Sequence, residues 1–154
     1  MTDHMTSADH ARSIDEARQR LISFVQQCTD ADWRAAPVAG DPRPVGVIAD
    51  HVAHSYEYLA GWISDLVAGE PVSVDAGIVD DLNAGHARDA GEVSQVLVVG
   101  HLRSSGDALL ALVAGLEPAQ LDLADGRVRR FALIAARHAD NHRTEIEEAL
   151  AAGG

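Results

Sequence analysis

Residues 128–149 read VRRFALIAARHADNHRTEIEEA, and this stretch decides the fold. Positions three or four residues apart lie on one face of an α-helix, so this spacing of side chains predicts a long amphipathic helix. The predicted inner stripe consists of Val128, Phe131, Ala135, His138, His142, Glu145 and Ala149. Its first half is apolar, whereas its second half carries three ionisable side chains where a core normally holds aliphatic ones. Because burying such groups unpaired is costly, they require partners, water or a metal ion.

A second predicted helix, over residues 44–68, supplies a further histidine. Pro44 suits a first helical turn. At about 100° per residue, His51 lies roughly 60° from the centre of the apolar stripe and His54 roughly 120° from it. Only His51 is therefore expected to point inward. Three imidazoles, from His51, His138 and His142, are enough to hold a divalent metal with coordination positions left open.

The rest of the chain adds helices and almost no strand signal, which predicts an all-α protein and a four-helix bundle. The four expected helices cover residues 7–28, 44–68, 91–116 and 126–152. The link over residues 69–89 is long enough to cross the length of a bundle, so the second and third helices can run parallel. It has room for a short helix at 79–88, as the segment 29–43 has for a turn around Trp33. We expect residues 1–10 to form a flexible tail and residues 11–152 to form one domain.

Composition and charge exclude several functional classes. The 154 residues carry a net charge of −12, and all 12 basic residues are arginine. This charge opposes binding to phosphate backbones, so no nucleic-acid partner is expected. No apolar run approaches 18 residues, so no membrane span is expected either. The lone Cys28 cannot form an internal disulfide, and the N-terminus lacks the pattern of a signal peptide, which predicts a cytoplasmic protein.

The remaining chemically capable residues have less specific interpretations. Glu145, one turn after His142, could orient a ligand or act as a base, and a solvated glutamate is an equally good interpretation. His54 is interpreted as a surface or rim residue, while Asn83 and His86 are assigned capping or loop roles in preference to the mouth of a site. Structural or solvated positions are expected for Tyr58, Trp62, His101, Cys28, Asp80, Asp81, Glu147 and Glu148.

Two segments resemble a known family. The stretches PVGVIADH (44–51) and HADNHRTEI (138–146) are similar to the DinB/YfiT-like superfamily of metal-binding four-helix bundles. The turn at Trp33, the long link and the segment 81–86 share this resemblance. It implies an up-down-down-up bundle, a divalent metal such as zinc or nickel held by His51, His138 and His142, and a homodimer.

The resemblance also suggests a reaction. Relatives include a mycothiol-dependent maleylpyruvate isomerase and bacillithiol transferases, which implies a metal-dependent thiol S-transferase or isomerase. Its partners would be a low-molecular-weight thiol such as mycothiol and an unknown second substrate. Two positions depart from the pattern: His138 stands where the isomerase branch usually has Glu, and Thr144-Glu145 replaces a frequent Gly-Gln. The alternatives are a non-catalytic metal- or small-molecule-binding stress or sensor protein, a metal-dependent hydrolase, and a helical dimer whose histidines bond one another.

Overall fold

The part of the chain described by a computed structural model, residues 5–90 and 93–153, contains seven helices and no strand. The helices are α1 (Ser7–Gln27), α2 (Asp30–Arg34), α3 (Val45–Val67), α4 (Ala76–Ala90), α5 (Gln95–Ala114), α6 (Pro118–Leu121) and α7 (Leu123–Gly153). The all-α prediction is confirmed. The predicted count of four covers only the long helices α1, α3, α5 and α7, because α2, α4 and α6 lie in the connections between them.

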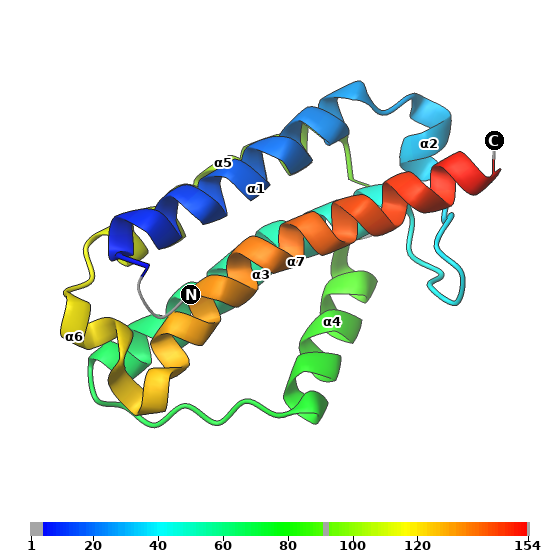
Figure 1. Ribbon diagram of the computed structural model, residues 1–154. Coiled ribbons are helices and arrows are strands. Elements are labelled where there is room, and N and C mark those ends of the chain that lie inside the picture. Colours follow the sequence, from blue (N-terminus) through cyan, green and yellow to red (C-terminus); the bar gives the residue numbers. More distant parts are fainter. Residues whose placement is uncertain (1–4, 91–92, 154) are drawn as a thin grey trace.

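The four long helices pack side by side, and their contacts give their directions (Figure 1). His10 and then Arg20 on α1 contact Arg129 and then Asp140 on α7, and this shared order places the two helices parallel. The Gln95 amide at the start of α5 donates to the carbonyl of Cys28 just after α1, so α1 and α5 are antiparallel. Helices α3 and α7 are antiparallel, because the start of α3 lies beside the second half of α7. Helices α1 and α7 thus run one way and α3 and α5 the other.

The predicted flexible tail over residues 1–10 overlaps the predicted first helix, and the structure shows where that helix begins. Thr6 and Asp9 form a capping box, in which each side chain accepts a hydrogen bond from the other residue's backbone N–H. Helix α1 therefore begins at Ser7. His10 is 1% exposed and accepts a hydrogen bond from Arg129 on α7. Residues 7–10 thus lie in α1, as the predicted helix over 7–28 has them, and residues 1–4 lie outside the described residues.

Local chemistry fixes the ends of α5 and α7. The Ser94 hydroxyl caps α5 by accepting from the backbone N–H of Leu97, which starts the helix later than the predicted residue 91. In α7, residues 124–126 have φ values of 54°, 56° and 80°, so regular helical geometry begins after Gly126, close to the predicted start.

A tight contact between α2 and α3 positions the start of α3. A Cβ on Gly46 would lie 2.7 Å from Trp33 Cε2, so the indole packs where only glycine leaves room. The indole N–H of Trp33 donates to the carbonyl of Val93 at 2.7 Å. Trp33 therefore connects α2, α3 and the segment before α5, at the end of the bundle nearest His51.

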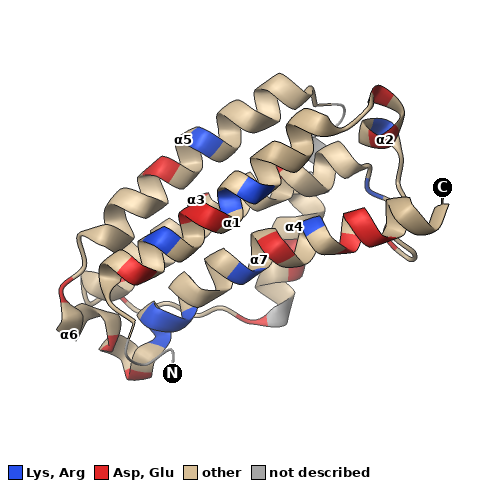
Figure 2. Cartoon of the chain, turned by 45° about the horizontal axis from the view of Figure 1, so that its top comes forward, with Lys and Arg blue, Asp and Glu red and all other residues tan. Residues whose placement is uncertain are grey.

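Helix α5 bears on the prediction that the chain has no membrane span. By length and composition α5 could cross a membrane, the one such helix found among the described residues. It contains Arg103 and Asp107, and its buried side chains belong to the core that α5 forms with α1 and α3. Elsewhere acidic and basic residues are interspersed along the helices (Figure 2).

Candidate metal centre

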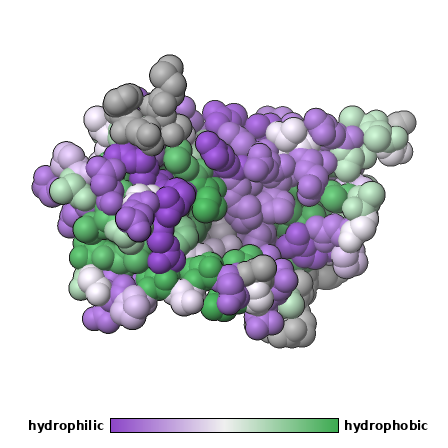
Figure 3. Space-filling view, turned by 60° about the horizontal axis from the view of Figure 1, so that its bottom comes forward, coloured by the Kyte–Doolittle hydropathy of each residue, from purple (hydrophilic) through white to green (hydrophobic). Residues whose placement is uncertain are grey.

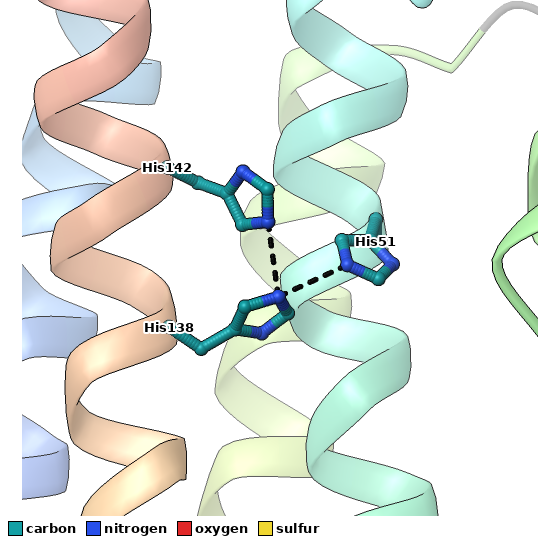
Figure 4. Close-up of side chains that lie close together, drawn as sticks. All are labelled: His51, His138 and His142. Atoms are coloured by element: carbon teal, nitrogen blue, oxygen red, sulfur yellow. Dashed lines mark hydrogen bonds between the residues drawn. The ribbon is translucent and has the colours of Figure 1, made fainter. Parts of the chain in front are cut away.

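Three histidines from two helices converge inside the bundle. Helix α3 presents His51, and α7 presents His138 and His142 one turn apart (Figure 4). The Nε2 atom of His138 lies 3.1 Å from that of His51 and 2.9 Å from that of His142. The structure thus brings together the three residues that the helical register predicted.

The donor set fits a divalent metal. Nitrogen ligands about 2.0–2.1 Å from a tetrahedral ion stand roughly 3.3 Å apart. The two Nε2 separations at His138 are a few tenths of an ångström shorter, so a small outward movement of the rings would give ligand spacing. Imidazole nitrogen is a preferred ligand of zinc, nickel and copper.

Burial keeps these imidazoles neutral. Burial, followed by the neighbouring imidazoles of His138 and His142, lowers the pKa of His51 to about 2. Burial and His142 lower the pKa of His138 to about 4. The pKa of His142 is lowered by burial and then by the Arg43 guanidinium. At neutral pH all three rings therefore have an unprotonated nitrogen, as metal binding requires.

A buried serine selects the tautomer of His138. The Ser55 hydroxyl donates to the carbonyl of Val52 at 2.6 Å and lies 3.1 Å from Nδ1 of His138. Because its own hydrogen is used, Ser55 accepts from His138 Nδ1–H, which leaves Nε2 bare toward the cluster. The sequence analysis did not reveal this role of Ser55.

Glu145 lies at the edge of the cluster. Its Oε1 atom is 3.9 Å from Nδ1 of His142, too far for a hydrogen bond, and its side chain is 51% exposed. It lines a pocket of about 600 Å³ together with Asn141 and Thr144 of the same helix. Its proposed action as a ligand-orienting group or base stays a prediction.

A second cluster, which the sequence did not reveal, is centred on Asp50, the residue of α3 that precedes His51. The two carboxylate oxygens of Asp50 each lie 2.7 Å from a ring nitrogen, Nε2 of His86 on α4 and Nδ1 of His101 on α5. The other nitrogen of His101 lies 2.6 Å from Glu57. Burial alone would lower the pKa of His101, but the hydrogen bonds to Asp50 and Glu57 raise it. This cluster, which we call the carboxylate–histidine network, joins α3, α4 and α5.

The structure also places the polar residues that the sequence analysis kept apart from the metal ligands. His54 stays outside the three-histidine cluster and stacks on His86, with ring centroids 5.2 Å apart. The capping or loop role assigned to His86 is wrong, because His86 is a buried residue within α4. Asn83 also lies within α4, and its Oδ1 atom is buried.

The residues expected to be structural or solvated have varied surroundings. Tyr58 and Trp62 are half-buried and their rings pack at 4.8 Å, in line with a core role. Burial raises the pKa of Cys28 to about 11, which keeps the thiol protonated. The four acidic residues expected to be solvated are exposed, namely Asp80, Asp81, Glu147 and Glu148.

Comparison with known proteins gives two matches. The family model described as the DinB superfamily matches residues 13–146. The solved structure of "Sibling Lethal Factor Precursor - DfsB" superposes with a TM-score of 0.70 and 17% sequence identity, covering 94% of this chain and 95% of that chain. At this identity the likeness shows a shared fold. Comparison with curated proteins finds no match.

Proposed function

The chain belongs to the DinB superfamily, and on that premise we propose that it is a metal-dependent thiol S-transferase or isomerase that uses a low-molecular-weight thiol. The superfamily is metal-binding. The observation that carries the proposal is the convergence of His51, His138 and His142, each of which offers a ring nitrogen within 4.8 Å of the others. The match to the family model includes all three histidines.

These three histidines are the proposed ligands, and zinc or nickel is the proposed ion. When bound, a divalent ion with three protein ligands holds a thiol or water at an open position and favours its ionised form. The imidazoles themselves are neutral and do not repel an anion that approaches them.

The surrounding residues hold this arrangement and limit access to it. Ser55 fixes the ring of His138 and is itself fully buried. His51 is 2% exposed, whereas the side chain of His142 is 18% exposed. Substrates are therefore proposed to approach from the side of His142 and Glu145. Burial of His51 keeps water away from that side of the cluster, which favours a reaction that must exclude water.

Metal analysis followed by a thiol titration tests this function. Protein purified without a histidine tag should carry about one divalent metal per chain. Addition of a thiol to the cobalt-substituted protein should then produce a sulfur-to-metal charge-transfer band, which should be absent from a His51→Ala variant. Turnover of a thiol substrate would establish the enzyme.

Each other outcome favours a stated alternative. Metal without a thiol band would favour a hydrolase or a metal-binding sensor. Absence of metal would favour a helical protein whose imidazoles bond one another at the observed 2.9 and 3.1 Å. The homodimer and the cytoplasmic location stay predictions from the sequence.

A further inference from the structure

Helix α4 reaches the candidate metal centre through one buried polar side chain. Among the α4 side chains described, residues 77–86, His86 alone is buried. Its ring lies 5.9 Å from the ring of His51, centroid to centroid. The hydrogen bond from His86 to Asp50 holds α4 in this position. Figure 3 brings this side of the molecule forward, where apolar and polar surface are interspersed.

The contact with Asp50 determines which nitrogen of His86 carries the hydrogen. A carboxylate accepts hydrogen bonds and cannot donate them, so Nε2 of His86 is the protonated nitrogen. In the neutral ring Nδ1 is then a bare acceptor. This Nδ1 atom is buried and has no hydrogen-bond partner in the described part of the chain. Buried polar atoms are nearly always bonded, so Nδ1 is suited to a donor supplied from outside the chain.

A second buried acceptor lies on the same helix. Asn83 precedes His86 by three residues, and residues at this spacing share a helix face. Its Oδ1 atom is also buried without a partner among the described residues. One face of α4 therefore presents two buried acceptors, and one of them belongs to His86, whose ring lies next to that of His51.

His51 adds a donor to these acceptors. Its Nδ1 atom is buried and unpartnered within the described residues, and in Figure 4 this second ring nitrogen points away from His138 and His142. When Nε2 serves as a metal ligand, Nδ1 carries the hydrogen. A hydroxyl group both donates and accepts, and so complements this mixed set. A carboxylate can only accept, and an ammonium can only donate.

We propose that the junction of α3 and α4, formed by His51, Asn83 and His86, is a subsite that binds a hydroxyl-bearing portion of the substrate. His54, stacked on His86 with an interplanar angle of 20°, holds the plane of the recognising ring. The inference rests on the proposed function for the position of the substrate's sulfur. Recognition of the hydroxyl groups rests on the buried polar atoms alone.

Two thiols of equal chain length provide the test. 1-Thioglycerol carries two hydroxyl groups that 1-propanethiol lacks, and the charge-transfer band of the cobalt-substituted protein reports the affinity of each. The wild-type protein should bind 1-thioglycerol about tenfold more tightly, as expected for one or two net hydrogen bonds. A His86→Gln variant keeps an N–H for Asp50 but has no acceptor at the position of Nδ1, and should lose most of this preference, since His51 and Asn83 remain. Asp81→Asn, an exposed substitution on the same helix, should leave the preference intact.

A measurement without thiol separates this inference from the proposed function. In the metal-free and zinc-loaded proteins, the ¹⁵N resonance of His86 Nδ1 should be that of a bare nitrogen and should shift on titration with glycerol. Equal affinity for the two thiols in the wild type would overturn the subsite while leaving thiol binding in place. If neither thiol produces a band, the function fails, and the glycerol titration decides the subsite alone. The subsite would be overturned by a protonated Nδ1. It would also be overturned if an internal water already bonds Nδ1 and glycerol leaves the ¹⁵N resonance unchanged.

Discussion

Two histidine clusters share helix α3, and they differ in the groups that face each imidazole. His51 faces two other imidazoles, and its pKa is lowered by burial and by those neighbours. His101 on α5 lies between Asp50 and Glu57 of α3, and its hydrogen bonds to them raise its pKa despite burial. An imidazole among imidazoles is favoured in its neutral form, which can bind a cation, whereas one between carboxylates is favoured in its protonated form and links the helices. The same residue type therefore serves two purposes within about two helical turns.

The largest expected effect would come from removing two ligands of the three-histidine cluster. The double change His138→Ala and His142→Ala should weaken binding of a divalent metal at least about 100-fold, because one imidazole remains. Elemental analysis and competition with a chelator measure this change. His54→Ala should bind metal like the wild type, since His54 stays outside the cluster. Full metal occupancy in the double variant would refute the assignment of the site.

Acid should destabilise the metal-free protein through the same cluster. The folded-state pKa values of His51 and His138, about 2 and about 4, lie below the ordinary value of 6.5. The unfolded chain therefore binds more protons below pH 6.5, and stability falls as pH falls. Between pH 7 and pH 5 the free energy of unfolding should drop by about 2 kcal/mol for each residue.

Urea unfolding at several pH values measures this dependence. The double variant His51→Phe and His138→Phe removes both titrating groups and should show a smaller drop. An equal drop in that variant would assign the acid sensitivity to carboxylates.

The carboxylate–histidine network should contribute mainly to stability. Asp50→Asn replaces a carboxylate that contacts two histidines, and should lower the free energy of unfolding by about 2–3 kcal/mol. The pKa of His101 should fall in this variant, which NMR titration can follow. Asp81→Asn, an exposed change on α4, should cost less than about 0.5 kcal/mol. A variant of Asp50 that unfolds like the wild type would show that the network carries no structural role.

The smallest effect should come from the serine behind His138. Ser55→Ala leaves His138 Nδ1–H buried without an acceptor, and should weaken metal binding about tenfold. Ser105→Ala is the matched control, because Ser105 is also buried and its hydroxyl donates to the His101 carbonyl of its own helix. Chelator competition distinguishes the two variants. Equal affinities would mean that Ser55 does not orient the ring.

The three-histidine cluster was predictable because α3 and α7 follow a regular helical period. Register alone points His51 inward, and the antiparallel packing of α3 and α7 brings it beside His138. The network around Asp50 was not predictable in this way. Its contacts join residues 36 and 51 positions apart on three helices, and no periodicity relates them. Likewise the polar composition of the first ten residues gave no sign that Arg129, 119 positions away, buries His10.

Helix α4 packs only weakly against the rest of the molecule, and this affects which parts of such proteins can change during evolution. Of its described side chains, residues 77–86, only His86 is buried, so α4 contributes little to the apolar core. Substitutions on α4 therefore meet few packing constraints, while those on α3 and α7 meet many. Residues of α4 can therefore change during evolution while the apolar core and the three imidazoles stay the same. Under the proposed function, a lineage that kept the long helices and exchanged α4 would keep the three proposed ligands and change the residues beside His51.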